Sequence, residues 1–382
     1  MVISGFLGEP ISGDVQNARR LSGTSPRKRN DMIVRTIKLK LTSRQEQTLT
    51  QWMFHLTGVW NWGIKKIEAN AKDKIYFSKQ TFQNLLAEHG EKLDIPSHTI
   101  QGILIQAHNS WARCFKRLAK KPHLKGVRNR LNSIPFPDPI KPPKEGKISI
   151  PGLGKVRFHK QELPEAKIKC GRIVRRASGW YLCLWIDTDH KFPVRQTDAS
   201  VGIDPGFHTL LTLSDGTKIE NPRELRTGAK RLAQAQRGSK KHLAARLQER
   251  QANRRSDRNH KITRKLVENY QTICYSDDNF KSMARHFGKS VSEASLGQLI
   301  GMLTYKSRTG GRELIPVNSF HTTMTCSSCG ALTGPTGFSG LAVRRWVCSV
   351  CGTDHDRDVN SAVVVLNAGV GTTHERGLRH VA

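Results

Sequence analysis

Four cysteines near the carboxyl end of the chain form two C-x-x-C pairs, Cys326 with Cys329 and Cys348 with Cys351. Eighteen residues separate the pairs, and a glycine follows each pair, where it lets the backbone turn so that amides point at sulfur. Zinc prefers four thiolates in a tetrahedron, and two such pairs supply them. We therefore expect one structural Zn²⁺, because four protein ligands leave no open position for catalysis.

Carboxylates at the ends of apolar segments form a second set of candidate ligands. Asp204 ends the run SVGID before a Pro-Gly turn, and Asp358 lies in HDRDVN before an apolar helix. Asp277 and Asp278 end the run TICYS. Each acid taken alone fits turn or helix-capping chemistry. Two-metal nucleases need several carboxylates that converge on Mg²⁺ ions, which bind oxygen ligands, and this recurrence favours such a site.

The charge of the chain indicates a polyanionic partner. The 382 residues include 63 Lys and Arg against 31 Asp and Glu, which leaves a formal charge of +32. A surplus of this size favours nucleic acid over a small acidic metabolite, which needs only a local patch. The sequence has no long apolar run, no amphipathic anchor and no lipidation motif, so we expect no membrane partner. Cysteine pairs of this kind favour a reducing intracellular location.

The amino-terminal half combines short strands with an inserted helical segment. Alternating residues over 33–41 predict a strand, and apolar residues at helical spacing predict helices over 43–70, 79–90 and 97–118. We assign Ser43 and Glu46 as a capping box at the first of these helices. Short alternating runs over 131–195 then predict a small antiparallel sheet or barrel. Residues 1–31 show no periodicity, and we expect a disordered leader or an extension upstream of a natural start at Met32.

The carboxyl-terminal half alternates strands with helices. Strands are predicted at 200–204, 209–213 and 218–220, with further strands at 272–276 and 313–317. Very basic helices occupy about 223–268, and residues 367–382 are expected to form a loose tail. Basic side chains of both halves are predicted to contact phosphates. These residues are Lys120, Lys121, Lys240, Lys241, Arg254, Arg255, Arg258, Arg344 and Arg345.

Several motifs together resemble the TnpB family, transposon-encoded relatives of the type V CRISPR effector nucleases. The matching pieces are IVRTIKLKLT, VGIDPG, the strand before Asn279, TTMTCSSCG and CGTDHDRDVNSA, and they extend over roughly residues 32–366. The last two, in this order and spacing, are the most specific.

The resemblance implies an α+β multidomain fold. Residues 32–195 are expected to form a barrel-like wedge domain with a helical recognition domain inserted at about 43–125. Residues 196–366 are expected to form a RuvC-like RNase H nuclease domain with a zinc ribbon at about 322–355.

The resemblance also implies RNA-guided cleavage of double-stranded DNA. The guide is a noncoding RNA from the transposon end, and the target lies beside a short adjacent motif. We expect one protein chain per RNA, two catalytic Mg²⁺ ions, and a cytoplasmic, nucleoid-associated location. Asp204 matches the first catalytic acid of the family, and Asp358 matches the last.

The middle acid departs from the family pattern. The family commonly has Glu-Asp-Leu-Asn here, whereas this chain has Ser276 in the place of the glutamate. Asp277 follows directly and is our first choice, while Asp278 shares the face of Ser276 by strand alternation. Glu313, on the strand before the cysteines, is a third possibility.

Two other functions stay open at the level of sequence. The chain could be an RNA-guided DNA-binding repressor that has lost cleavage, which the replacement at Ser276 favours. It could also be a zinc-ribbon nucleic-acid-binding protein without enzymatic activity. RNA that co-purifies with the protein separates the third reading from the first two, and a plasmid-cleavage assay separates those two.

Overall fold

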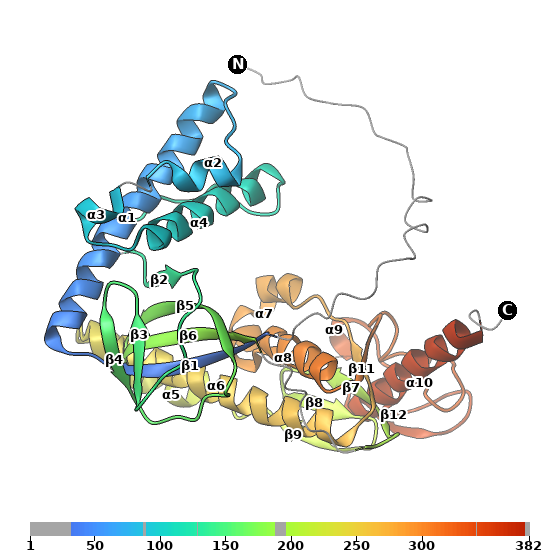
Figure 1. Ribbon diagram of the computed structural model, residues 1–382. Coiled ribbons are helices and arrows are strands. Elements are labelled where there is room, and N and C mark those ends of the chain that lie inside the picture. Colours follow the sequence, from blue (N-terminus) through green and yellow to red (C-terminus); the bar gives the residue numbers. More distant parts are fainter. Residues whose placement is uncertain (1–31, 87–88, 128, 188–195, 341, 379–382) are drawn as a thin grey trace.

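The computed structural model describes residues 32–86, 89–127, 129–187, 196–340 and 342–378, and their side chains up to residue 371 (Figure 1). The expected leader at 1–31 lies outside the described residues. None of the described helices is both long enough and apolar enough to cross a membrane.

The first half is built on a six-stranded antiparallel sheet with the order β2-β5-β6-β1-β4-β3. Its strands are β1 (Met32–Lys40), β2 (Ser133–Phe136), β3 (Lys147–Ile150), β4 (Gly154–Phe158), β5 (Lys167–Arg176) and β6 (Gly179–Asp187). β1 lies inside the sheet, between β6 and β4, although about 90 residues separate it from β2. The prediction that these strands bracket a helical insertion is confirmed.

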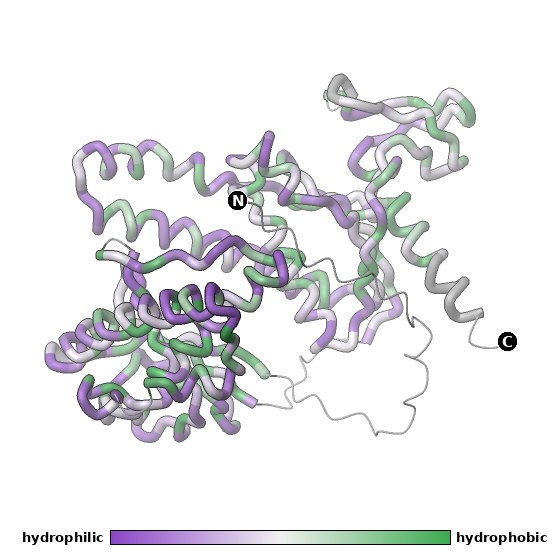
Figure 2. Tube along the Cα trace, turned by 90° about the horizontal axis from the view of Figure 1, so that it is seen from above, coloured by the Kyte–Doolittle hydropathy of each residue, from purple (hydrophilic) through white to green (hydrophobic). Residues whose placement is uncertain are grey.

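Four helices form the insertion and project from one end of this sheet (Figure 1). They are α1 (Ser43–Lys72), α2 (Lys79–Asn84), α3 (His89–Leu93) and α4 (Ser97–Phe115). Leu56 of α1 and Ile103 and Leu104 of α4 are fully buried in one core that continues into the sheet. Hydrophobic and hydrophilic residues alternate along the helices in Figure 2, as expected for helices with one packed face.

The capping box of α1 differs by one position from our assignment. Thr42 caps the helix, and its side chain and backbone pair reciprocally with Gln45. Glu46 instead accepts a hydrogen bond from the indole nitrogen of Trp180 at 3.1 Å, which ties the helix to β6. A tertiary partner therefore claimed the side chain that a local pattern had assigned to the cap.

The second half contains a mixed five-stranded sheet with the order β11-β10-β7-β8-β9. Its strands are β7 (Ser200–Pro205), β8 (Thr209–Leu213), β9 (Lys218–Glu220), β10 (Thr272–Ser276) and β11 (Glu313–Val317). β7, β10 and β11 run parallel, whereas β8 and β9 are antiparallel to their neighbours. The predicted strands are confirmed.

Helices cover both faces of this sheet. The helices between the strands are α5 (Glu224–Arg237), α6 (Lys241–Asn269), α7 (Phe280–Ala294) and α8 (Leu296–Thr309). Val201 and Ile203 of β7 share a core with Leu266 of α6 and Leu299 of α8. α10 (Arg357–Leu378) covers the opposite face.

A glycine on β7 brings α10 unusually close to the sheet. A Cβ atom on Gly202 would lie 2.0 Å from the carbonyl oxygen of Ala362, so only glycine fits beneath the helix. Gly369 lies equally close to Cys274 of β10. α10 therefore continues past residue 366 and is helical through Leu378, which corrects the expectation that a loose tail begins at 367.

The zinc-ribbon segment connects β11 to α10. It contains the short helix α9 (Gly337–Gly340) and the two-stranded pair β12 (Arg345–Val347) and β13 (Asp354–Asp356). Because β13 runs directly into α10, the cysteine pairs are continuous with the helix that carries Asp358.

Candidate active site and zinc site

Three carboxylates from distant parts of the chain line one pocket beside the second sheet. Asp204 lies at the end of β7, Asp278 lies two residues beyond β10, and Asp358 lies in the first turn of α10. The pocket has a volume of about 430 Å³, and Ser276 and Arg344 also line it. Residues 154 positions apart in sequence are thus brought to one site, because parallel strands end at the same edge.

Asp204 is the most perturbed of these acids. The hydroxyl of Ser361 on α10 donates a hydrogen bond to its Oδ1 at 3.2 Å. Burial, followed by the negative charges of Asp358 and Asp278, raises the pKa of Asp204 to about 7. The pKa of Asp278 is also raised, chiefly by burial. A cluster of acids whose charge the protein leaves partly uncompensated is the electrostatic pattern of a cation site.

The structure reverses our order of preference for the middle acid. Asp278 lines the pocket and accepts a hydrogen bond from Ser276 at 3.2 Å. Asp277 is exposed and does not line it, and its charge instead raises the pKa of Tyr275. Alternation explains the difference, because odd-numbered residues of β10 face α6 and α8 while even-numbered ones face α10.

Glu313 is excluded from the pocket by its position on β11. In the parallel pairing Glu313 lies opposite Thr272, whereas Val317 lies opposite Ser276 at the end near the acids. Four residues along a strand correspond to about 13 Å. Glu313 is exposed at the far end of β11, so the sequence prediction that offered it as a third possibility is wrong in geometry.

The first turn of α10 is fixed by an acid that the sequence prediction did not select. Asp356 Oδ1 accepts hydrogen bonds from the backbone amides of Asp358 and Val359, both at 3.1 Å. Its Oδ2 forms an ion pair with Lys218 of β9 at 2.7 Å. Asp356 therefore acts as the helix cap, and the capping-type spacing in DRDV is the signal that could have identified it.

Arg344 lies beside the acids. Its guanidinium is 3.4 Å from both carboxylate oxygens of Asp358, and its side chain is more than half exposed. The neighbouring Arg345 pairs with Asp354 at 3.0 Å on the outer side of the ribbon. Only the first of these two predicted nucleic-acid contacts is therefore at the pocket.

The four predicted cysteines converge. The Sγ atoms of Cys326 and Cys351 are 3.6 Å apart, as are those of Cys329 and Cys348. Zn–S bonds of about 2.3 Å in a tetrahedron require sulfur separations of roughly 3.8 Å. Within the described part of the chain, these cysteines are the one group of three or more potential metal ligands whose donor atoms all lie within 4.8 Å of one another. The cluster fits a zinc site.

The backbone around the cysteines has the expected form. Gly330 and Gly352 have φ values of +81° and +74°, in the left-handed region that favours glycine. Their amides donate to the carbonyl oxygens of Cys326 and Cys348, each at 2.9 Å. Both pairs therefore turn tightly around the metal position, as their spacing predicts.

The zinc site and the acidic pocket are joined through α10 and the segment before it. Nε2 of His355 is 3.0 Å from Sγ of Cys326, and the ring of His355 packs on Trp346. Asn360, buried on α10, accepts from the amide of Ser327 at 2.9 Å and donates to the carbonyl of Thr325 at 2.8 Å. The chain segment around a zinc ligand is thus bonded to the helix turn that carries Asp358.

The predicted phosphate-contacting residues divide into exposed and buried ones. Most are exposed. These are Lys120, Lys121, Lys240, Lys241, Arg254, Arg344 and Arg345. Lys121 also pairs with Glu68, and Arg255 is half-buried with its guanidinium donating to the carbonyl of Ser292 at 3.2 Å.

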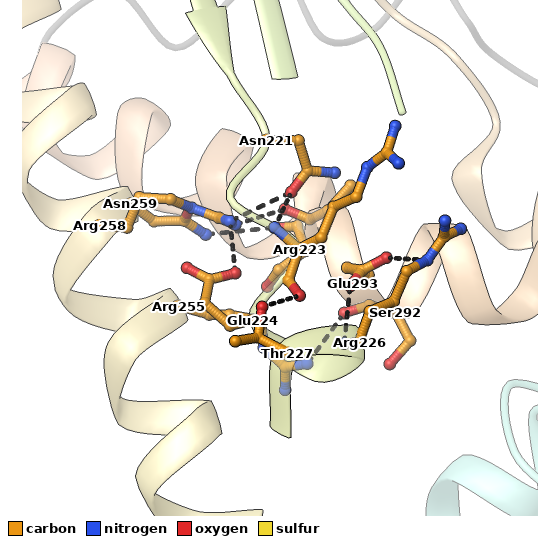
Figure 3. Close-up of polar contacts among 12 residues, drawn as sticks. Asn221, Arg223, Glu224, Arg226, Thr227, Arg255, Arg258, Asn259, Ser292 and Glu293 are labelled. Carbon is orange, nitrogen blue, oxygen red and sulfur yellow. Dashed lines mark hydrogen bonds and ion pairs between the residues drawn. The ribbon is translucent and has the colours of Figure 1, made fainter. Parts of the chain in front are cut away.

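Arg258 does not face the surface, and its assignment as a phosphate contact is corrected. Its guanidinium donates to Glu224 at 2.9 Å and to the carbonyl of Ala294 at 2.8 Å (Figure 3). Both charged side chains of this pair are 11% exposed. A second pair joins Arg226 to the buried Glu293 at 3.0 Å. Together they fasten α5, α6 and α7, so Arg258 stabilises the helices rather than contacting a partner.

Comparisons with known proteins agree with these motifs. Residues 184–286 match a family profile described as "Probable transposase", and residues 297–365 match one described as "Cas12f1-like, TNB domain". Among solved structures, the "Cryo-EM structure of the Cas12f1-sgRNA-target DNA complex" covers 88% of this chain and 99% of its own, at 17% identity and a TM-score of 0.35.

Curated relatives match most of the chain. A "Putative RNA-guided DNA endonuclease" from Streptomyces pristinaespiralis is 31% identical over 300 residues, 73% of either chain. The "Putative RNA-guided DNA endonuclease InsQ" of Escherichia coli (strain K12) is 26% identical and covers 72% of this chain and 75% of its own. A "TnpB-like protein L79" from Acanthamoeba polyphaga mimivirus is 28% identical over 47% of this chain and 39% of its own. By this likeness along most of its length, the chain belongs to the TnpB family.

Proposed function

We propose that this protein is an RNA-guided, Mg²⁺-dependent DNA endonuclease of a transposable element. The observation that carries the proposal is the convergence of Asp204, Asp278 and Asp358 on one pocket at the edge of the second sheet. The names of its relatives support nuclease activity, and the charge of +32 supports nucleic acid as the ligand.

The three carboxylates are suited to holding Mg²⁺. They offer oxygen ligands in a pocket, and the raised pKa of Asp204 reflects mutual repulsion that a divalent cation relieves. Bound Mg²⁺ supplies an activated water and stabilises the leaving oxygen in phosphodiester hydrolysis. Asp204, Asp278 and Asp358 are its proposed ligands.

Other residues of the pocket have roles that need no metal. Ser361 holds Asp204 in place by its hydrogen bond, and Asp356 caps the helix turn that presents Asp358. Arg344 has an exposed guanidinium beside Asp358, where it can bind a DNA phosphate. We propose that Arg344 moves from Asp358 to the phosphate when DNA enters.

We also propose the division of labour implied by the family. Residues 196–366 form a RuvC-like RNase H nuclease domain, and residues 32–195 form the wedge and recognition domains that hold RNA and DNA. The guide is a noncoding RNA from the transposon end, and one chain binds each RNA. The proposed location is the cytoplasm, in association with the nucleoid.

The test is cleavage of a supercoiled plasmid by the full chain loaded with its native RNA. We expect linear product in Mg²⁺ when the plasmid carries a sequence matched to the guide, and none when the match is scrambled. Uncut plasmid despite sequence-matched binding would overturn the nuclease proposal.

One observation favours a second candidate, an RNA-guided DNA-binding repressor. Ser276 lies in the pocket wall where the family has glutamate, and it donates to Asp278 instead of supplying a charge. If Asp278 does not replace the missing acid, the site lacks one anionic ligand. Binding without cleavage is the outcome expected of that candidate.

A further inference from the structure

An aromatic pocket at the free end of the helical insertion lies far along the chain from the acids. It has a volume of about 120 Å³ and lies between the end of α1, the loop before α2 and the end of α4. Tyr76, Phe77, Trp111 and Phe115 contribute the aromatic part of its lining. None of the roles assigned above uses this pocket.

Two of these rings are exposed and stand on a firm base. Tyr76 is 69% exposed and Phe115 is 53% exposed. The ring of Phe115 stacks on the buried Trp111 with centroids 5.3 Å apart, and Tyr76 meets Phe115 edge to face at 6.4 Å. The carbonyl of Phe77 contacts Nε2 of His108 at 3.2 Å, which holds the loop against α4. The exposed ring faces are therefore positioned without a partner that covers them in the described chain.

Positive charge surrounds the pocket. Lys72, Lys74, Lys116 and Arg117 are exposed within four residues of Tyr76 or two of Phe115. Lys121 lies over the ring of Trp111 at 5.9 Å and pairs with Glu68, the acid nearest in the contacts of this region. A second copy of this chain would bring the same positive charges against this face and be repelled. A polyanion with apolar ring faces matches both features.

We propose that the Tyr76–Phe115 pocket is a stacking site for an unpaired nucleobase of RNA. Bases inside a duplex are stacked on one another, so an exposed ring reaches only a base in a loop, bulge or single strand. The surrounding lysines and Arg117 then bind the phosphates on either side of that base. The inference rests on the proposed function, because the guide is the RNA that would supply this base.

Cross-linking locates the site. The full chain, freed of RNA, is mixed with a 12-nucleotide uridine RNA that carries 5-iodouridine and is irradiated. We expect cross-links in the tryptic peptide Ile75–Lys79, which contains Tyr76 and Phe77. Cross-links elsewhere in the chain with none in this peptide would overturn the inference.

Affinity separates stacking from phosphate binding. The uridine 12-mer is compared with an abasic 12-mer that has the same phosphates, for the wild type and for the double variant Tyr76→Leu/Phe115→Leu. We expect the double variant to lose about tenfold of its affinity for the uridine RNA, as one lost stacking contact predicts. Its affinity for the abasic RNA and its salt dependence stay unchanged, because no cation is removed.

Matched variants keep the result interpretable. Tyr76→Phe retains the ring and is expected to bind uridine RNA as the wild type does, whereas leucine retains apolar surface without a ring. Equal affinity of the leucine variant and the wild type for uridine RNA overturns the stacking site alone. A wild-type chain that binds neither RNA overturns the proposed function as well. A wild-type dimer in sedimentation that the leucine variant loses would assign the pocket to a second copy and overturn the inference.

Discussion

The side chain of Asn360 accepts a hydrogen bond from the backbone amide of Ser327, 2.9 Å away, and so joins α10 to the first cysteine pair. The same carboxamide donates to Thr325, on the other side of Cys326. Asn360 lies two residues after Asp358 and is 2% exposed. The order of the zinc site and the position of a proposed catalytic acid are therefore mechanically connected.

We predict that Asn360→Ala weakens both sites. Loss of two hydrogen bonds in a buried place costs about 1–3 kcal/mol and releases the backbone around Cys326. Zinc should transfer to a chelator more readily, and cleavage should require more Mg²⁺. Asn367→Ala, at an exposed position of the same helix, is the matched control. Wild-type zinc retention in Asn360→Ala would show that the link is idle.

We predict one tightly bound Zn²⁺ per chain. The four sulfur atoms are already placed for a tetrahedral ion, and binding should contribute to folding of the ribbon. Elemental analysis of protein purified under reducing conditions measures the ratio. Cys326→Ser should lower both the zinc content and the thermal stability of the ribbon, whereas Cys114→Ser, outside the cluster, should leave the zinc content unchanged. A ratio near zero in the wild type would contradict the site.

The carboxylates should separate by side of the strand. Asp204→Ala, Asp278→Ala and Asp358→Ala are expected to reduce DNA cleavage by at least about a hundredfold, because each removes a proposed metal ligand. RNA-guided DNA binding should persist, which a gel-shift assay measures. Asp277→Ala is the neighbouring control and should cleave as the wild type does. Full activity of Asp278→Ala with loss in Asp277→Ala would show that the pocket rearranges in the complex.

The basic helix α6 offers a matched pair of arginines. Arg258→Ala leaves Glu224 without its partner in a largely buried place and should destabilise the protein by roughly 2–4 kcal/mol in urea unfolding. Arg254→Ala, at an exposed position, should leave stability unchanged. It should lower the salt slope of RNA binding by about 0.7–0.9 if it contacts one phosphate. The opposite assignment of the two effects would refute the placement of these residues.

A buried lysine should give the protein a pH-dependent stability. Lys306 of α8 is 3% exposed and donates to the carbonyl of His260 at 2.6 Å and to the hydroxyl of Thr263 at 2.8 Å. Burial, which disfavours the charged form, lowers its pKa from 10.5 to about 8. Between these values the unfolded chain binds more protons than the folded chain, so the free energy of unfolding rises with pH.

The comparison with Lys306→Met isolates this effect from other titrating groups. As the pH rises from 8 to 10.5, the wild type should gain about 2–3 kcal/mol in stability relative to the variant. Denaturant unfolding of both proteins at several pH values in this window measures the gain. A constant difference between them would place the pKa of Lys306 near its ordinary value.

The sequence by itself determined the features that depend on local spacing. Metal-binding cysteines must be close in space, so the two C-x-x-C pairs and their glycines specify the zinc site before any fold is known. The strands and the helical insertion follow from periodicity, since side chains alternate along strands and recur every 3.6 residues in helices. Asp204 and Asp358 were identified from their positions at segment ends together with the family motifs.

Only the tertiary structure decided which neighbours these residues meet. Asp277 and Asp278 are equivalent by composition, and the packing of α10 on one face of β10 selects Asp278. Glu313 is on the correct strand but at the wrong end, which the register of β11 against β10 reveals. Arg258 looks like its exposed neighbours in sequence, yet Glu224, 34 residues away, buries its charge. Such choices depend on contacts between distant segments, which no local pattern encodes.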